Sequence, residues 1–398
     1  MADSGEFLGA QEAADILGVS RNTLYVYVGR HGLRSQPVPG SRERRYWKAD
    51  ILRLKHSGRT ADRSPGELRR ESALTLVTDD GPYYRGRSAI ELAGSSSLEE
   101  VASILWARPS DEIFTGDPPR TPAAFDQWTK LLAAESSVDR ALGLFPRLEQ
   151  ADLRAYDLTV SGMARTGADV VRWMTAIILR QNKAPSGAIH QHIARSLKLD
   201  DAKAQVVRRL LVLAADHGFE PAAYAVRAVA STGVSPWRAV MTGLLVVLGR
   251  RSGFGRFETM RLFLSELAQG DPEGSVVRRL RDGDPVPGFG SRLYPKGDPR
   301  AATLVAHCAE VFPDDPKLKH VLTASAVMLD AKGLQPDFAL ACMLAGELLG
   351  PPIADSLFLI GRSVGWIAHS IEQYAAGEFE HLEGLYLGPL PGSRSAVR

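Results

Sequence analysis

The chain has 398 residues, of which 44% are hydrophobic and 24% charged, and its net charge is only +2. This composition excludes a disordered chain, and no apolar run reaches the roughly 20 residues that a transmembrane helix needs. The length exceeds that of one ordinary domain, so we expect two or three domains in a cytoplasmic protein that has no signal peptide and does not enter a membrane.

The positive charge is concentrated near the N-terminus. Between Arg21 and Arg63 there are eleven basic and three acidic residues, a net charge of +8. The first 72 residues together carry +4, and the remaining residues carry −2. This asymmetry predicts an N-terminal module that binds a polyanion, joined to a nearly neutral body.

Two short helices around a tight turn are predicted in the first module, within the segment AQEAADILGVSRNTLYVYVGRHGL. Gly18 ends the first helix, and Ser20 is a suitable N-cap for the second. Arg21, Asn22 and Tyr25 then lie on the exposed N-terminal side of the second helix. A recognition helix presents side chains to base edges and phosphates from this position.

A basic wing is predicted to follow, because the segment SRERRYWKADILRLK carries Arg44 and Arg45 into a further helix. The arrangement resembles the winged helix-turn-helix of MerR-type and excisionase-type DNA-binding proteins. The resemblance implies a DNA-binding domain over residues 1–56 and a polar linker over residues 57–72. One such module contacts too few phosphates for tight binding at physiological salt, so a homodimer is expected. The alternative is a helical interaction module with a solvated basic face.

The body, from residue 73 onward, is predicted to be all-α after one short strand and turn in LTLVTDDGPYY. Long apolar-periodic segments are separated by short Gly and Pro breaks. These helical segments are expected at 152–164, 168–180, 201–216, 221–232, 237–249, 257–268, 301–311, 317–330, 337–349 and 353–375.

Motifs for nucleotides, metals and serine hydrolysis do not occur in the body, because there is no GxGxxG, P-loop, zinc-type ligand spacing or Gly-x-Ser-x-Gly elbow. We therefore expect no metal site and no bound cofactor. The two cysteines, Cys308 and Cys342, fall in apolar helical segments and are expected to be buried, reduced thiols.

Five short motifs occur in the order found in one enzyme family. They are TLVTDDGPYYRG with IELA, LAADHGFEPAAYAVRAVAST, GFGSRLYPKGDPRA, PDFALACMLAGELLGPP and GRSVGWIAHSIEQ. Together they resemble the citrate synthase family over residues 74–389. The resemblance implies a mostly helical homodimer with a large domain over 73–253, a small mobile domain over 254–348, and a return to the large domain over 349–398.

The family condenses acetyl-CoA with oxaloacetate, and the resemblance assigns roles to several residues. Asp337 matches the family's catalytic aspartate, although an Asp that begins a helix is also a good N-cap. His217 matches an oxaloacetate-binding histidine. Arg300 and Arg362 match arginines that bind the carboxylates of oxaloacetate.

Two positions depart from the family, because its catalytic histidines fall at Ser252 and Ser291. A serine hydroxyl can donate a hydrogen bond to an oxyanion, but it cannot exchange a proton near neutral pH as imidazole does. Losing a positioned acid or base costs about 10²–10⁴-fold in rate. Arg292 and Lys296 lie in the same loop as Ser291 and are candidates to bind CoA phosphates, with solvated charge as the alternative.

Three interpretations of function remain open. The first is a DNA-binding regulator whose synthase-like body binds a dicarboxylate or a CoA thioester. The second is an active acyltransferase that condenses an acyl-CoA with oxaloacetate or a related 2-oxo acid. The third is a dimerisation platform with an empty pocket.

Overall fold

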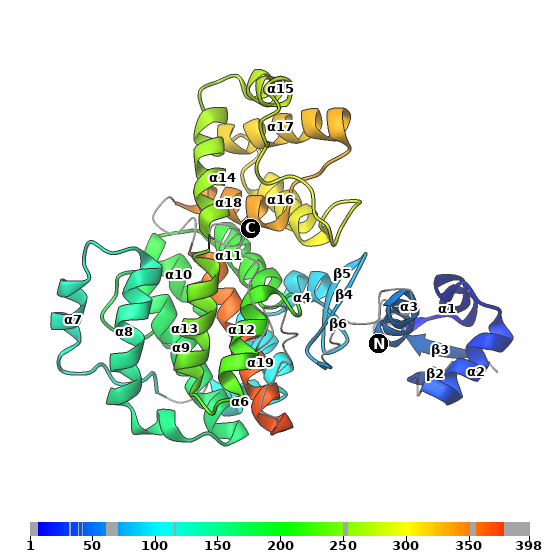
Figure 1. Cartoon of the computed structure of the whole chain (residues 1–398), viewed down its shortest axis with the longest axis horizontal. Helices are drawn as coiled ribbons and strands as arrows, with labels where there is room; N and C mark the ends of the chain where they lie inside the picture. The colour runs from blue at the N-terminus through cyan, green and yellow to red at the C-terminus, as the bar shows by residue number, and fades with distance from the viewer. Residues whose placement is uncertain are drawn as a thin grey trace, which may run out of the picture.

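The computed structural model describes residues 7–31, 33–38, 40–41, 43–60, 71–114, 117–249, 254–350 and 356–377. Ser252, most of the predicted linker and most of the predicted C-terminal return lie outside the described residues. Residues 7–60, which we call the head, contain a small sheet and helices (Figure 1). The elements of the head are β1 (Phe7–Leu8), α1 (Ala10–Leu17), α2 (Arg21–His31), β2 (Ser35–Pro37), β3 (Arg44–Trp47) and α3 (Lys48–Thr60).

The head has the predicted helix-turn-helix with a β-hairpin wing. Gly18 ends α1 in the left-handed region, at a φ of 68°. The Ser20 hydroxyl accepts a hydrogen bond from the Thr23 amide at 3.2 Å and so caps α2. Strands β2 and β3 pair antiparallel, and β1 pairs with the other edge of β3. Leu24 and Ile51 are fully buried in the core between these elements.

Residues 71–377 form the body, which is built mainly from helices (Figure 1). It begins with an antiparallel sheet of β4 (Thr75–Thr78), β5 (Gly81–Tyr84) and β6 (Arg87–Ser88). The first helices of the body are α4 (Ala89–Ser95), α5 (Leu98–Trp106), α6 (Ser110–Ile113), α7 (Phe125–Leu131), α8 (Ser137–Ala151), η1 (Leu153–Tyr156), α9 (Val160–Ile178), α10 (Ile189–Leu197), α11 (Asp201–Ala214), α12 (Pro221–Ala230) and α13 (Pro236–Val247). The later helices are α14 (Phe254–Leu267), α15 (Pro272–Asp282), α16 (Pro299–Val311), α17 (Pro316–Lys332), α18 (Phe338–Leu349) and α19 (Leu357–Ala376).

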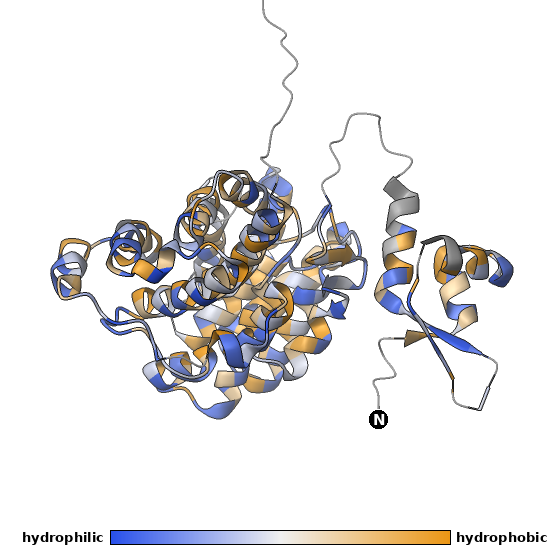
Figure 2. Cartoon of the chain, turned by 90° about the horizontal axis from the view of Figure 1, so that it is seen from below, coloured by the Kyte–Doolittle hydropathy of each residue, from blue (hydrophilic) through white to orange (hydrophobic). Residues whose placement is uncertain are grey.

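Helix α19 is the centre of the larger part of the body, where it packs against α5, α9, α11, α12 and α13. Nearly every residue of α19 from Leu357 to Ile371 is buried. Figure 2 shows apolar residues concentrated toward the middle of the body. Helices α14 to α18 form a second group that stands on one side of the first (Figure 1). This helical architecture agrees with the predicted all-α body.

One pair of predicted helices was wrong. The sequence predicted helices over 152–164 and 168–180, with a break near Gly167. The structure has the short 3-10 helix η1 and then a single long helix, α9, that runs through Gly167. A Cβ atom at Gly167 would lie 2.7 Å from Ile367 of α19. Gly167 therefore allows close packing of two helices, and it does not end one.

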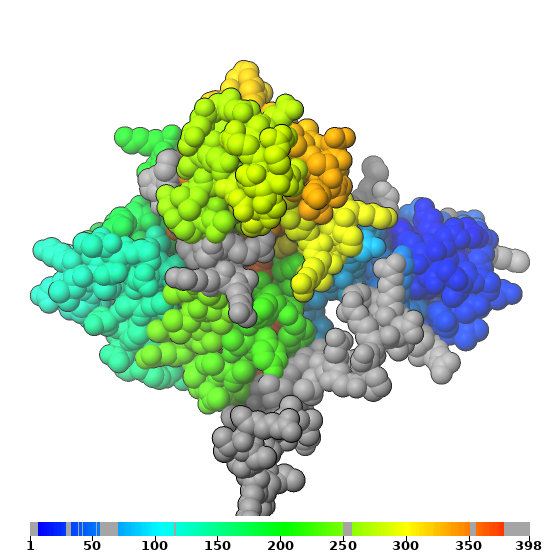
Figure 3. Space-filling model, turned by 45° about the horizontal axis from the view of Figure 1, so that its top comes forward, coloured from blue at the N-terminus to red at the C-terminus, as the bar shows by residue number. Residues whose placement is uncertain are grey.

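The head contacts the body through the hairpin of β4 and β5, and Figure 3 shows the head on this side of the molecule. Ala49 and Leu52 of α3 form a buried apolar cluster with Tyr83 of β5. Trp47 packs beside Gly86, where a Cβ atom would lie 2.9 Å from the indole nitrogen. Lys48 lies 3.6 Å from the Asp80 carboxylate.

Both cysteines are buried and unpaired, as predicted. Burial raises the pKa of the Cys308 thiol to about 12, and burial also raises the pKa of Cys342. Neither thiol is therefore a nucleophile at neutral pH. Within the described residues, no helix combines the length and the apolar composition needed to cross a bilayer.

Candidate functional site

A cavity of about 610 Å³ lies between the two helix groups of the body. Its walls come from α12, α13, α14, α16, α18 and α19, and from the loop before α16. Of the residues that the sequence singled out, the structure brings six together at this cavity: His217, Ser291, Arg292, Arg300, Asp337 and Arg362. Lys296 is exposed in the same loop and does not line the cavity. The cavity therefore joins segments that are up to 145 residues apart in the chain, from 217 to 362.

His217 follows α11 and carries a neutral imidazole. Its Nε2 atom shares a hydrogen bond of 2.8 Å with the hydroxyl of Tyr294. Burial, together with the charges of Arg300 and Arg362, lowers the pKa of His217 well below its usual value. The imidazole and the phenol thus offer neutral hydrogen-bonding groups to a ligand oxygen.

Asp216 holds the turn beside His217 in place. It is fully buried, and its Oδ1 atom lies 3.2 Å from Nε2 of His369. Its Oδ2 atom accepts a hydrogen bond from the Gly218 amide at 3.0 Å. Burial would raise the pKa of Asp216, but the interactions with His369, Arg362 and Thr75 together outweigh this effect and lower the pKa below its usual range.

The two buried arginines at the cavity each have a carboxylate partner within the protein. Arg300 donates from Nε and Nη2 to the two oxygens of Asp298, at 3.1 and 2.7 Å. The Nη1 atom of Arg362 lies 2.8 Å from Oε1 of Glu220. Each guanidinium also faces an aromatic ring. The Cζ atom of Arg300 lies 4.3 Å from the centre of the Phe338 ring, and that of Arg362 lies 5.0 Å from the centre of the Phe358 ring.

Asp337 is both an N-cap and part of the cavity wall. Its Oδ1 atom accepts a hydrogen bond from the Leu340 amide at 2.9 Å and so caps α18. Its backbone amide donates to the carbonyl of Gly288 at 2.7 Å. The cap and a place at the cavity are therefore compatible for this residue, since it caps α18 with Oδ1 and also lines the cavity.

Ser291 lies in a loop that is fixed to the segment before α18. The Gly290 amide donates to the carbonyl of Gln335 at 2.9 Å, and Phe289 forms a β-bridge with Pro336. The Ser291 hydroxyl accepts hydrogen bonds from the amides of Leu293 at 3.2 Å and Tyr294 at 3.4 Å. Both of these bonds use the hydroxyl oxygen as acceptor, and the role of Ser291 as a neutral donor to a ligand stays a prediction.

The predicted DNA-binding residues are all exposed on the head. Arg21, Asn22 and Tyr25 are exposed at the start of α2, and Arg44 and Arg45 are exposed on β3. Arg44 donates from Nε to the Ser35 hydroxyl at 3.0 Å across the wing.

Sequence reasoning missed Glu220, Tyr294 and Asp298. Each is only a few residues from a predicted ligand-binding residue. A Glu directly before Pro221 is typical of the start of a helix, yet its side chain makes no capping hydrogen bond. Only Asp298 carried a signal in the sequence, because it lies two positions before Arg300 and a buried arginine needs a counter-ion.

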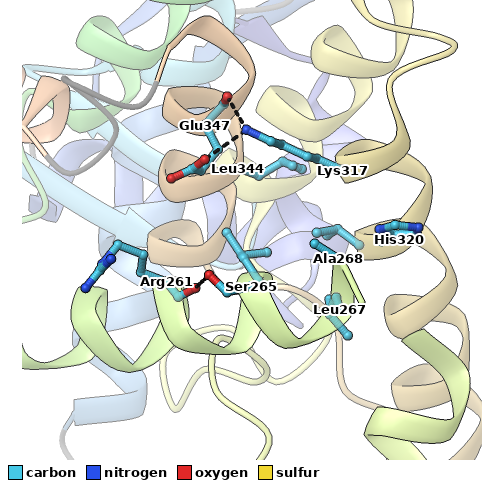
Figure 4. A pocket seen from close by; sticks show the side chains of 10 residues that line it. Arg261, Ser265, Leu267, Ala268, Lys317, His320, Leu344 and Glu347 are labelled. Carbon is cyan, nitrogen blue, oxygen red and sulfur yellow. Dashed lines mark hydrogen bonds and ion pairs between the residues drawn. The ribbon is translucent and has the colours of Figure 1, made fainter. Parts of the chain in front are cut away.

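A second cavity lies within the group of α14, α17 and α18 (Figure 4). Its volume of about 100 Å³ holds only a few water molecules. At its edge the Lys317 ammonium donates to the Glu347 carboxylate at 2.9 Å, so the local charge is compensated. This cavity is too small for a dicarboxylate or a CoA thioester. Among the described residues, no group of three or more His, Cys, Asp or Glu side chains is placed to hold a metal ion.

Comparison with family models gives two matches. The model described as citrate synthase, C-terminal domain, matches residues 112–382. A model described as a helix-turn-helix domain matches residues 7–59.

Individual relatives agree with these matches. A 2-methylcitrate synthase of Mycobacterium tuberculosis is 27% identical over 351 residues, which cover 78% of this chain and 86% of the relative. A citrate synthase of Haloferax volcanii is 28% identical over 81% of this chain and 94% of the relative. A putative citrate synthase 2 of Mycobacterium bovis is 29% identical over 47% of this chain, and there the chain spans only 52% of the relative's length.

Solved structures show the same fold. Citrate synthase from Thermoplasma acidophilum, in a ternary complex with carboxymethyl coenzyme A and oxaloacetate, has a TM-score of 0.69 at 17% identity. The match covers 84% of this chain and 97% of that structure. Citrate synthase from Thermotoga maritima has a TM-score of 0.66 at 20% identity over 83% of this chain and 96% of that structure.

Proposed function

The chain belongs to the citrate synthase family, and from that premise we propose that it is a DNA-binding regulator whose synthase-like body binds a small carboxylic acid or an acyl-CoA. Two chains in a homodimer present two basic heads to one DNA duplex. Ligand binding in the cavity changes the spacing of these heads and so the affinity for DNA.

The observation that carries this proposal is a continuous path of contacts from the head to the cavity. Tyr83 of β5 packs against Leu52 of the head. The next residue, Tyr84, points the other way, and its hydroxyl donates toward the Val212 carbonyl at 3.1 Å and accepts from the Asp216 amide at 3.3 Å. Asp216 is followed directly by His217 at the cavity. One strand therefore contacts the head with one tyrosine and the cavity wall with the next.

The turn of the same hairpin reaches a second wall of the cavity. A Cβ atom at Gly81 would lie 3.6 Å from Pro299, the first residue of α16. Arg300 follows on that helix and lines the cavity. A ligand that moves α16 toward α12 therefore acts on the hairpin that supports the head.

The departures at Ser252 and Ser291 support a binding role over efficient synthesis. The resemblance places a catalytic histidine at each position. A serine can donate a hydrogen bond there, but it cannot give up or take a proton near neutral pH as a histidine does. His217, Arg300 and Arg362 at the cavity are binding groups, and Asp337 keeps the position of the family's catalytic aspartate. In this proposal the body retains the means to hold a ligand but has serines in place of the two acid–base histidines.

The test is DNA affinity with and without ligand. A duplex selected from a random library on the full chain is titrated by fluorescence anisotropy, alone and with oxaloacetate or acetyl-CoA. We expect at least one ligand to change the affinity. The double variant Arg44→Ala with Arg45→Ala should weaken binding and reduce the slope of log affinity against log salt by about 2. An affinity that both ligands leave unchanged, although calorimetry shows them bound, would contradict a sensor.

An active acyltransferase is the second candidate, and the joint presence of Asp337, Ser291 and His217 at one cavity favours it. In this function Asp337 removes a proton from the acyl methyl group, and the hydroxyl of Ser291 donates to the developing oxyanion. The measurement is release of the CoA thiol with oxaloacetate and either acetyl-CoA or propionyl-CoA. Turnover that disappears in Asp337→Ala would establish the enzyme, and its absence with both thioesters would leave the regulator.

A further inference from the structure

We propose that Glu220 makes the cavity selective for a 2-oxo acid that has a single carboxylate and a short apolar substituent. Glu220 takes the place beside Arg362 that a second ligand carboxylate would need. The inference rests on the proposed function, because it assumes that the body binds a small acid.

The pairing of Glu220 with Arg362 is the first observation. Arg362 is only 2% exposed, so its charge needs a counter-ion inside the protein. The Oε1 atom of Glu220, 2.8 Å from Nη1, is that counter-ion. Glu220 is the N-cap residue of α12, yet its side chain makes no hydrogen bond to the helix amides. The carboxylate is directed to the arginine and lines the cavity.

Arg300 is compensated more fully than Arg362, whose Nε and Nη1 atoms make no hydrogen bond among the described residues although Glu220 lies beside them. Two nitrogens of Arg300 are bonded to Asp298, and the face of the guanidinium packs on Phe338. Neither buried arginine therefore presents an uncompensated charge to a ligand. If a dianionic ligand bound both arginines, one of its carboxylates would lie next to Glu220 and the other next to Asp298, and the like charges would repel each other.

The charge of the described cavity wall is balanced. It contains the cations Arg292, Arg300 and Arg362 and the anions Glu220, Asp298 and Asp337. Arg292 is exposed at the opening and has no carboxylate within 4.0 Å among the described residues, so it can attract one ligand carboxylate.

The rest of the wall suits an uncharged ligand group. Val246, Val247, Phe257, Phe338 and Phe358 give the cavity an apolar side. The hydrogen-bonded pair of His217 and Tyr294 has one neutral donor left for a ketone oxygen, because one of its two protons is used in the hydrogen bond between them. One carboxylate, one ketone and a short alkyl chain match these three features together.

Calorimetric titration of the full-length chain, without DNA, tests the inference with two four-carbon acids. 2-Oxobutanoate and oxaloacetate differ in that only oxaloacetate has the second carboxylate. We expect the wild-type chain to bind 2-oxobutanoate about tenfold more tightly than oxaloacetate, because of repulsion from Glu220. The variant Glu220→Gln should reverse this preference. Glu135→Gln, an exposed glutamate that does not line the cavity, is the matched control and should keep the wild-type ratio.

The outcomes separate this inference from the proposed function. Tighter binding of oxaloacetate by the wild-type chain, or an unchanged ratio in folded Glu220→Gln, overturns the selectivity and leaves a ligand-binding regulator. Binding of neither acid overturns both the selectivity and the binding of a small acid. Thermal unfolding of Glu220→Gln checks its fold, and the wild-type comparison decides the preference even where that variant does not fold.

Discussion

At the residue scale, the cavity combines groups that have structural and binding roles at once. Asp337 caps a helix and also lines the cavity. Glu220 stands at the start of α12 and neutralises a buried arginine. The role of such a residue is ambiguous in a sequence, because an acidic residue is expected at the start of a helix and can equally contact a ligand or a distant arginine. Substitutions that keep one role and remove the other distinguish them.

Asp337 provides such a pair of substitutions. Asp337→Asn keeps an oxygen that can accept from the Leu340 amide, whereas Asp337→Ala removes the cap and should cost about 1 kcal/mol in the free energy of unfolding. Urea unfolding of both variants measures this difference. If Asp337 also acts as a base, both variants lose thiol release equally. Equal stability of the two variants would contradict the capping role.

His217 gives a prediction about pH. Its pKa is lowered in the folded protein, so below about pH 6.5 the unfolded chain binds a proton that the folded chain does not. Stability contributed by the neutral imidazole is present above this pH and is lost as the pH falls. The free energy of unfolding should fall by up to about 1.4 kcal/mol per pH unit from this residue, and His217→Gln should remove that part of the slope. Identical slopes between pH 6.5 and 5 would contradict a neutral buried imidazole.

At the element scale, the loop that carries Ser291 is held against the start of α18. Gly288 has a φ of +84°, and a Cβ atom there would lie 2.7 Å from Cβ of Leu340. Backbone hydrogen bonds donated by the amides of Gly290 and Asp337 also hold the loop against the start of α18. Because these two segments form adjoining walls of the cavity, the shape of the cavity depends on this contact.

Gly288→Ala tests the attachment, with Gly333→Ala as its control. Both glycines have positive φ, but nothing lies within 4 Å of a Cβ atom at Gly333. We expect Gly333→Ala to cost about 1 kcal/mol in the free energy of unfolding, from backbone strain alone. Gly288→Ala should cost about 3 kcal/mol in the free energy of unfolding and weaken ligand binding, because the backbone strain and the steric overlap with Leu340 add. Chemical unfolding measures both, and equal costs would show that the close approach is not important.

At the scale of the whole molecule, the hairpin of β4 and β5 lies between the head and the cavity. Neighbouring residues of α3 face different cores, since Ile51 packs within the head and Leu52 packs against Tyr83. A change at Leu52 therefore affects the contact between head and body more than the fold of the head.

The variant Leu52→Asp should uncouple DNA binding from ligand binding. We expect the variant to bind DNA and to bind ligand, but its DNA affinity should no longer respond to ligand, because the path through Tyr83 is broken. Leu131→Asp, at a leucine that is 79% exposed on α7, is the matched control. Anisotropy titrations with and without ligand measure the response. A response in Leu52→Asp equal to that of the control would mean that coupling takes another route.

The sequence by itself determined the class of each part: a basic helix-turn-helix, an all-helical body, and the candidate residues His217, Arg300, Asp337 and Arg362. The first two features follow from local patterns, since periodicity and capping residues act within a few turns of the chain, whereas the candidate residues follow from the resemblance of short motifs to the citrate synthase family. The tertiary structure decided what the patterns do not contain. It joined α9 across Gly167, because close packing against α19 outweighs the helix-breaking tendency of one glycine. It also brought Glu220 to Arg362, 142 positions away, because a buried charge is paired by whichever carboxylate the fold places beside it.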